Sequence, residues 1–233
     1  MDCKIVRGPS GFGDAIYLKA ALDICFGTGA NITVLNNFPE VLVGYETIPY
    51  TNGTQVDYDF SYVLRKKKKD TNQFEDMLIQ SGLFTIAEAK KCEFDLRFTY
   101  NPAASVKDPK DYVDRNPTMI TIPPYGGFGN GQGVNAYMTP DQYGYEKLLT
   151  QYRKDYDVIT INEKKPFSEL VSLFTNSDKV YCQQGWGTAL AEGLGIPCDV
   201  IFTKKALNSK NKFLETITPE KIFTKKTSKA IIL

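Results

Sequence analysis

The sequence predicts an α/β fold made of two units, each built on a mostly parallel sheet. Short apolar segments typical of strands alternate with longer segments of helical periodicity, and this alternation is typical of parallel sheets. Residues 101–116 interrupt it, because they are rich in Pro, Asp, Lys and Ala and have weak periodicity. The alternation then restarts. We therefore expect a linker here, with an N-terminal unit over residues 1–115 and a C-terminal unit over residues 116–233.

The N-terminal unit begins with a strand at Lys4–Arg7, followed by a glycine-containing turn and a helix over residues 15–25. Glycines at positions 27 and 29 end this helix, because glycine readily adopts the backbone conformations that terminate helices. The other elements expected in this unit are strands at 31–35, 57–64 and 95–100, and helices at 74–83 and 86–91.

The C-terminal unit has a regular β-α-β-α-β-α-β pattern, which is the pattern of a doubly wound sheet. The predicted strands are 118–122, 157–161, 179–182 and 198–203, and the predicted helices are 141–152, 167–175 and 187–194. Ligands of doubly wound sheets bind beyond the carboxyl ends of the strands, where helix N-termini converge. Three such strand ends in this chain carry candidate site residues.

The first candidate is the turn that follows the first strand. Gly11 and Gly13 let a backbone or a phosphate approach closely, and the unpaired N–H groups of the helix start attract anions. Asp14 lies at the tip of this turn. The chain contains no histidine, so a general base must be a carboxylate, Lys, Tyr or Cys. Asp14 is therefore the candidate catalytic base, and the alternative is that it only caps its helix.

The second candidate is the loop over residues 125–133, which contains five glycines and follows the strand at 118–122. Such a loop can wrap a phosphate or lie over a sugar, and the alternative is a loop without a ligand. The candidate donor-binding residues in it are Tyr125, Gly126 and Gly127.

The third candidate is the segment that follows the strand at 179–182. Its glycines and Thr188 open a helix whose free N–H groups suit a diphosphate. Glu192 lies one helical turn after Thr188, where a carboxylate can accept hydrogen bonds from both hydroxyls of a ribose. The alternative is a tightly packed turn with a solvated Glu192. The candidate donor-binding residues here are Gln184, Gly185, Trp186, Gly187, Thr188 and Glu192.

Metal chemistry is not expected. The five cysteines are scattered, and without histidine they do not form the spacing of a zinc site. Asp57-Tyr-Asp59 and Asp155-Tyr-Asp157 have the DxD form of metal-dependent transferases. Each falls at the start of a strand, so we expect a structural role for both.

Charge is unevenly distributed, although the formal net charge is only +1. Residues 65–69 are five consecutive positive charges, and residues 203–233 contain eight lysines against two glutamates. These clusters either keep a surface solvated or bind a polyanion such as DNA or anionic lipid. No apolar run is long enough to cross a bilayer and no signal peptide is evident, so we expect no transmembrane segment and a cytoplasmic protein, in the host cytoplasm if it is viral.

Two segments together resemble the ADP-heptose:lipopolysaccharide heptosyltransferase-like family of GT-B glycosyltransferases. Residues 11–22 are similar to the GxGD segment and following helix of that family, and residues 168–197 look like its donor half. The resemblance implies two facing Rossmann-like units with a nucleotide-sugar donor held by residues 125–133 and 183–192. It also implies that Asp14 deprotonates the acceptor hydroxyl, that the anomeric carbon is inverted, and that no cofactor or metal is needed. The chain departs from the family at residues 183–188, where the family usually has Asp-Ser/Thr-Gly and then His.

The expected function is therefore a metal-independent, inverting transfer of a sugar from a nucleotide-sugar donor to a hydroxyl. The acceptor is either a bacterial surface glycan, as the family likeness implies, or a hydroxymethylated DNA base, as in phage DNA-modifying transferases. The small size and the lysine clusters favour DNA. The alternative is a nucleotide or nucleotide-sugar binding protein without turnover, and the presence of Asp14 speaks against it.

Overall fold

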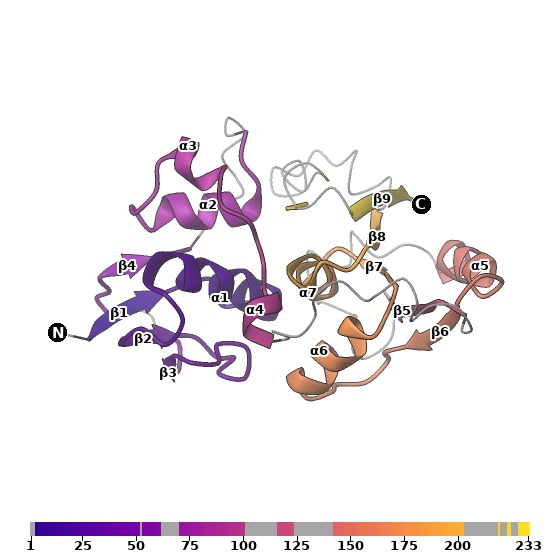
Figure 1. Ribbon diagram of the computed structural model, residues 1–233, viewed down its shortest axis with the longest axis horizontal. Coiled ribbons are helices and arrows are strands. Elements are labelled where there is room, and N and C mark those ends of the chain that lie inside the picture. The colour runs from indigo at the N-terminus through magenta and orange to yellow at the C-terminus, as the bar shows by residue number, and fades with distance from the viewer. Residues whose placement is uncertain are drawn as a thin grey trace.

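The computed structural model contains two parallel sheets with helices between their strands, which confirms the predicted α/β fold (Figure 1). All strand pairs within the described parts of the chain are parallel. None of the helices in these parts is long and apolar enough to span a membrane. The residues that the structure describes are 3–51, 53–61, 70–100, 116–123, 142–202, 219, 223–224 and 228–233.

The N-terminal unit is a four-stranded sheet with the order β3-β2-β1-β4. All four residues of β2 are buried, as expected for a strand covered on both faces. The strands are β1 (Lys4–Arg7), β2 (Ile32–Leu35), β3 (Glu46–Ile48) and β4 (Tyr58–Asp59), and the helices are α1 (Phe12–Phe26), α2 (Gln73–Gln80), α3 (Ile86–Ala89) and α4 (Arg97–Tyr100).

The C-terminal unit is a five-stranded sheet with the order β6-β5-β7-β8-β9. The strand and helix alternation predicted for this half is confirmed, and a further strand follows it at the C-terminus. The strands are β5 (Thr118–Ile122), β6 (Asp157–Thr160), β7 (Lys179–Gln183), β8 (Cys198–Phe202) and β9 (Ser228–Ile232), and the helices are α5 (Gln142–Tyr152), α6 (Phe167–Thr175) and α7 (Trp186–Leu194).

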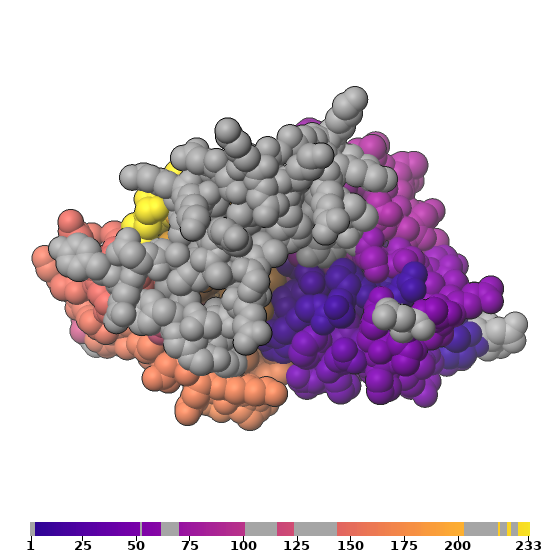
Figure 2. Space-filling model, turned by 180° about the vertical axis from the view of Figure 1, so that it is seen from behind, coloured from indigo at the N-terminus to yellow at the C-terminus, as the bar shows by residue number. Residues whose placement is uncertain are grey.

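Helix α1 is central to the molecule, because it packs on α2 of its own unit and on α7 of the other. Residues 15–22 are all buried, including the charged Lys19, so α1 is not the half-exposed helix of a typical sheet surface. Figure 1 shows α1 and α7 side by side between the two sheets. From behind, orange residues of the second unit lie beside indigo and purple residues of the first at the lower edge of the view (Figure 2).

Aromatic side chains fill the junction between the units. The Phe12 ring makes edge contacts with Phe38 of its own unit and with Phe167 and Trp186 of the other, at centroid distances of 5.2, 5.8 and 5.8 Å. One continuous hydrophobic core includes buried residues of both sheets. The units are therefore joined by apolar burial, which is the dominant favourable contribution to association.

Two predicted strands are wrong in type or length. Residues 95–100 were expected as a strand, but the structure has the short helix α4 there. The Asp95 carboxylate accepts a hydrogen bond from the Arg97 N–H at 2.9 Å, and such local side-chain bonds favour a turn or helix start over a strand. The strand expected at 57–64 is only Tyr58–Asp59 in the structure, and residues 62–69 lie outside the described residues.

Strands β3 and β9 were not predicted. β3 has only three residues, too few to show an alternating pattern, and β9 follows a lysine-rich segment that was interpreted only by its charge. The predicted linker at 101–115 lies outside the described residues, so the exact boundary between the units stays a prediction.

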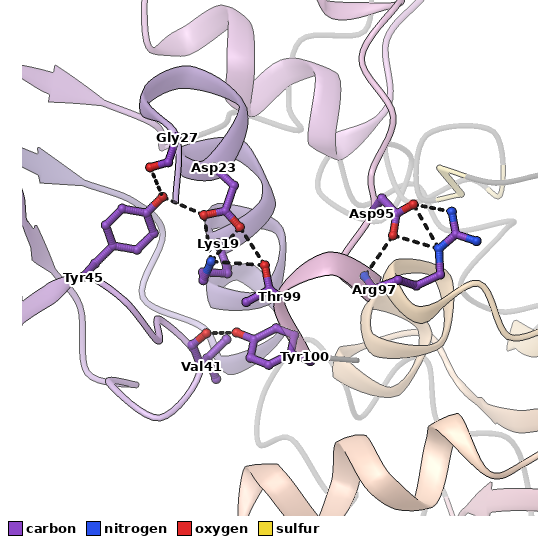
Figure 3. A network of polar contacts seen from close by, with 9 residues as sticks. All are labelled: Lys19, Asp23, Gly27, Val41, Tyr45, Asp95, Arg97, Thr99 and Tyr100. Atoms are coloured by element: carbon purple, nitrogen blue, oxygen red, sulfur yellow. Dashed lines mark hydrogen bonds and ion pairs between the residues drawn. The ribbon is translucent and has the colours of Figure 1, made fainter. Parts of the chain in front are cut away.

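The chain that leaves the N-terminal unit touches both units before position 101. The Leu96 N–H donates to the Gly193 carbonyl of α7 at 2.7 Å, and a Cβ at Gly193 would lie 2.4 Å from a Leu96 methyl. On its other side, Thr99 donates to the Asp23 carboxylate of α1 at 2.9 Å, within a polar network that Figure 3 shows. This segment therefore connects α7 to α1 through hydrogen bonds to both helices.

Candidate active site

The candidate site lies where both sheets reverse their strand order. In the N-terminal sheet β2 and β3 lie on one side of β1 and β4 on the other, so the reversal is at β1. In the C-terminal sheet the reversal is between β5 and β7, because β6 lies beyond β5. Crevices at such points are where open α/β sheets bind ligands. The turn that carries Asp14 follows β1, and the turn that carries Gly185 follows β7.

Asp14 is in the first turn of α1, at its third residue, and is partly buried. The N-cap of this helix is Gly11, so the interpretation of Asp14 as the capping residue is wrong. Its Oδ1 atom accepts a hydrogen bond from the Gln73 side-chain amide at 3.0 Å. The positive end of the helix dipole and this amide both favour the ionised carboxylate.

Gly11 and Gly13 are both close-approach positions, but to different partners. A Cβ at Gly11 would lie 2.5 Å from the Asp14 Oδ2 atom, so the missing side chain makes room for the carboxylate. A Cβ at Gly13 would lie 3.1 Å from Cα and 3.2 Å from N of Trp186, the first residue of α7. The structure therefore brings the first and third candidate segments together, although they are far apart in sequence.

The start of α7 is built by glycine. Gly185 precedes the helix with φ +156°, a conformation that side-chain-bearing residues rarely adopt. Gly187 is buried, and a Cβ there would lie 2.5 Å from the Ile122 Cδ1 and 3.2 Å from the Cys182 Sγ. Gly187 thus lets α7 lie directly on β5 and β7. Trp186 is half-buried between Phe12 and Phe174 in the aromatic junction.

Glu192 is fully buried, so the alternative of a solvated Glu192 is wrong. Its Oε2 atom accepts hydrogen bonds from the Thr224 N–H and hydroxyl at 2.9 and 2.5 Å. Its Oε1 atom accepts one from the Ser228 hydroxyl at 2.6 Å. Thr188, one turn before it, is also buried, with its hydroxyl 3.7 Å from the Cys182 sulfur. Both carboxylate oxygens of Glu192 therefore hold the C-terminal segment against α7.

Tyr17 lies one turn after Asp14 and is buried. Burial raises the pKa of its phenol well above the usual range, and the negative charges of Glu192 and Asp14 raise that pKa further. Burial likewise raises the pKa of the Cys198 thiol, with a further contribution from Cys182. Both groups stay protonated at neutral pH, so neither can act there as a base or a thiolate nucleophile.

Several sequence candidates fall outside the described residues. These are Tyr125, Gly126 and Gly127 of the glycine loop 125–133, the basic run 65–69 and most of the lysines of 203–233. The strand before the glycine loop ends at Ile122, which pairs with Cys182 of β7. Lys229 is the exception among those lysines, since it lies exposed on β9.

The Asp57-Tyr-Asp59 motif lies in the N-terminal sheet. Asp57 accepts a hydrogen bond from the Ile5 N–H at 2.8 Å, and Asp59 accepts one from Arg7 at 2.5 Å. Burial raises the pKa of Asp59, but its hydrogen bonds from Arg7 and Ser61 outweigh that effect and hold it below the usual value. These contacts agree with a structural role. Among the described residues no group of three or more Cys, Asp or Glu side chains is placed to hold a metal ion.

Gln73 is the site residue that the sequence did not reveal. It is the first residue of α2, fifty-nine positions after Asp14, and its side chain is buried. Glutamine at a helix start has no motif of its own, so only the folded structure brings it to Asp14.

Comparison with solved structures identifies the fold. The sequence matches no protein-family model and no curated protein. The structure is similar to ADP-heptose LPS heptosyltransferase II of E. coli, with a TM-score of 0.59, 13% identity, and coverage of 99% of this chain and 90% of that chain. This chain has a heptosyltransferase fold.

A second heptosyltransferase has an equally similar structure. TibC, an iron-containing heptosyltransferase solved with ADP-D-β-D-heptose, matches with a TM-score of 0.59 and 11% identity over 98% of this chain. This chain covers only 63% of the TibC chain, so it spans less than two thirds of that protein. The predicted resemblance and the GT-B-like arrangement of two mostly parallel sheets are confirmed by these two heptosyltransferase structures.

Proposed function

We propose that this protein is a glycosyltransferase that moves a sugar from a nucleotide-sugar donor to a hydroxyl acceptor. The heptosyltransferase fold supports this, and one observation carries it: the Asp14 turn packs directly on the first residue of α7, with Gly13 against the Trp186 backbone. A base and an anion-binding helix start, one from each unit, are thereby side by side. This is the geometry that a transfer between two bound substrates needs.

In the proposed reaction the hydroxyl oxygen of the acceptor forms a bond to the anomeric carbon of the donor sugar. Asp14 removes the proton of that hydroxyl as the bond forms. The bond from that carbon to the donor diphosphate breaks on the opposite face, so the anomeric carbon is inverted. Backbone N–H groups at the start of α7 stabilise the departing diphosphate, and no metal is required for this. Tyr17 and Cys198 stay protonated at neutral pH, so of these three residues Asp14 is the one that can act as the base.

The donor is proposed to bind between the β7 turn and the glycine loop. Gln184, Gly185 and Trp186 are partly exposed at the β7 turn. Gly187, Thr188 and Glu192 are buried. A ribose reaches the Glu192 carboxylate only if the hydrogen bonds from Thr224 and Ser228 are displaced. We therefore propose direct donor contacts mainly for the first group and for Tyr125, Gly126 and Gly127.

Two acceptors follow from different observations. The LPS in the name of the similar E. coli enzyme supports a bacterial surface glycan. The basic run 65–69 and the lysine-rich residues 203–233 support a hydroxymethylated DNA base, as in a phage enzyme. We further propose a cytoplasmic location, supported by free cysteines throughout and by the Cys182 and Cys198 sulfurs, which are unbonded at 3.8 Å.

The test is a screen of UDP-, GDP- and ADP-sugars for transfer to glycan and DNA acceptors, followed by Asp14→Asn. The variant is expected to bind donor within about twofold of wild type but to transfer sugar at least about a hundredfold more slowly, as for a lost general base. Asp70→Asn is the control, because Asp70 is an exposed carboxylate paired with Lys90.

Activity is also expected to persist in EDTA. A requirement for manganese would contradict the proposed metal-free mechanism, and an Asp14→Asn rate within threefold of wild type would remove Asp14 from it. Donor binding without transfer to any acceptor would favour a binding protein instead.

A further inference from the structure

The Asp14 carboxylate accepts a hydrogen bond from a residue that has no acid–base chemistry of its own, and it lies over a glycine. On one side the Gln73 Nε2 atom donates to Oδ1 at 3.0 Å. On the other side Oδ2 lies over Gly11, at the place where a Cβ would be 2.5 Å away. One oxygen therefore has a fixed donor, and the carboxylate has a defined orientation relative to its helix.

The Gln73 backbone is itself fixed. It lies inside a capping box, in which the Asn72 side chain accepts from the Glu75 N–H at 2.9 Å and the Glu75 carboxylate accepts from the Asn72 N–H at 3.0 Å. Such a box satisfies two helix-start donors and sets the position of the first residue. The next residue, Phe74, packs on Phe94, at 5.2 Å between ring centroids. The Gln73 side chain is only 4% exposed, so it has little freedom to turn away.

An amide is suited to hold a general base. It donates to the ionised carboxylate and so favours the form that can accept a proton. It has no charge of its own, and its hydrogen bond uses only one of about four lone-pair positions of the carboxylate. A lysine in its place would stabilise the charge more strongly and make Asp14 a weaker base.

We propose that Gln73 is a positioning residue for the glycosyl transfer, which orients the Asp14 carboxylate toward the acceptor and keeps it ionised. This inference rests on the proposed function of Asp14 as the base. It makes the start of α2 part of the active site, although α2 itself contributes no group that reacts.

The test compares Gln73→Met, which keeps the length of the side chain but removes the amide, with Gln80→Met at the end of the same helix as the matched control. Gln73→Met is expected to lower kcat about tenfold with donor KM within about twofold, because the base is misdirected rather than lost. The acid limb of the pH–rate profile is expected to move up by on the order of 0.5–1 pH unit, since the ionised carboxylate has lost a hydrogen bond. Gln80→Met is expected to match wild type in rate and pH profile.

Gln73→Glu separates positioning from packing. Glutamate has nearly the shape of glutamine, but a second buried carboxylate lowers stability whatever the role of Gln73, so the readout is the acid limb of the pH–rate profile and not stability. A positioning role predicts a larger upward shift of the acid limb than in Gln73→Met, because a second carboxylate next to Asp14 disfavours its ionisation. In the Asp14→Asn background, Gln73→Met is expected to cause no further loss, since residues that act as a unit are not additive.

A Gln73→Met enzyme with wild-type kcat and pH profile overturns the proposal, and so does full additivity with Asp14→Asn. Titration of the Asp14 carboxyl by ¹³C NMR supplies a readout that needs no turnover: equal titration midpoints in wild type and Gln73→Met overturn it as well. These results differ from failure of the proposed function, which is seen when wild type transfers no sugar or Asp14→Asn retains its rate.

Discussion

Gly11 and Gly13 are two residues apart, but a methyl group at each would meet a different part of the molecule. At Gly11 the nearest atoms are those of the Asp14 side chain, which would have to turn to make room. At Gly13 it would meet the Trp186 backbone at the start of α7, which cannot move without moving the helix. The absence of a side chain at Gly11 therefore affects the orientation of the Asp14 carboxylate, whereas its absence at Gly13 affects the packing of the two units.

We predict that Gly11→Ala and Gly13→Ala fail in different ways. Gly11→Ala is expected to lower turnover about tenfold by turning the Asp14 carboxylate, with little change in stability. Gly13→Ala is expected to lower the free energy of unfolding on the order of 1–2 kcal/mol, as overpacking does in a filled interface. Urea denaturation and steady-state kinetics of both variants test this. Equal stability losses in the two would show that the contact with α7 does not matter.

Besides its contact with α1, helix α7 packs on β5 and β7 through Gly187. The C-terminal segment is hydrogen-bonded to the same helix at Glu192. Among the described residues, Thr224 and Ser228 donate three hydrogen bonds to the Glu192 carboxylate; Thr224 precedes β9 and Ser228 begins it. A fully buried carboxylate is unfavourable unless it is well hydrogen-bonded, so this contact specifies where the C-terminal strand lies.

We predict that Glu192→Gln loosens β9. The amide replaces one accepting oxygen by a donor that faces hydroxyl and N–H donors, and a lost hydrogen bond to a charged group costs about 1.5–3 kcal/mol. Amides of Ser228–Ile232 are expected to exchange faster in deuterium-exchange measurements. Glu169→Gln, an exposed glutamate paired with Lys165, is the control. Unchanged β9 exchange together with weaker nucleoside diphosphate binding would instead favour a direct donor contact of Glu192.

Helix α4 is anchored to α1 by Thr99, which donates a hydrogen bond to Asp23, a member of an ion pair within α1. Lys19 is fully buried and pairs with Asp23 at 2.6 Å, and Asp23 also accepts from the hydroxyls of Tyr45 and Thr99 at 2.6 and 2.9 Å (Figure 3). Burial lowers the pKa of Lys19, whereas the hydrogen bonds that Lys19 donates to Asp23 oppose this. Lys19 is fully buried and is paired with the charge of Asp23, whereas Asp23 also accepts hydrogen bonds from two hydroxyls. Loss of the carboxylate is therefore expected to cost more stability than loss of the ammonium.

We predict that Asp23→Asn destabilises the protein more than Lys19→Met. Asp23→Asn leaves a buried ammonium without its partner charge, which costs about 3–5 kcal/mol in buried pairs. Lys19→Met removes the charge and fills the space of the aliphatic part of the lysine side chain. Asp23 then keeps two hydroxyl donors and some solvent contact. Urea denaturation of both variants measures the difference. Equal losses would mean that Asp23 does not compensate the buried charge.

The two units meet at one junction, where aromatic side chains of α1 and α7 are in contact. The proposed site lies at the edge of this junction. The basic segments at 65–69 and 203–233 belong to different units by sequence. If both line one surface, a duplex could contact the two units at once. Charge, rather than shape, would then determine its binding.

We predict weak duplex DNA binding that falls steeply with salt. Non-specific binding of this type has a Kd of about 10⁻⁴–10⁻⁶ M at physiological salt, because bound lysines release counterions from the phosphates. A gel-shift series from low to moderate salt measures it, beside transfer assays on hydroxymethylated and plain DNA. Replacing the four lysines of 65–69 by glutamine is expected to reduce the salt slope. No binding at low salt and no label in modified DNA would leave the glycan as the acceptor.

Elements with a strong local signal were predicted well. The Lys4–Arg7, Thr118–Ile122 and Phe167–Thr175 elements have the predicted bounds, because their apolar spacing and flanking breakers are local properties. Residues 95–100 were predicted wrongly, because their apolar alternation resembles a strand, whereas a hydrogen bond from Leu96 to α7 and local bonds at Asp95 select a helix. Strand β9 depends on pairing with β8, which sequence spacing does not reveal.

The α/β class, the glycine turns and the place of Asp14 at a helix start follow from neighbours within a few residues, so the amino-acid order was enough to predict them. The partners of the site residues do not follow from sequence neighbours. Gln73 reaches Asp14 across 59 positions, and Trp186 reaches Gly13 across the junction of two sheets. Glu192 was expected to face a ribose, and the structure has it buried under Thr224 and Ser228. Contacts of this kind depend on how separate elements pack, and packing is decided by the whole chain burying its apolar surface at once.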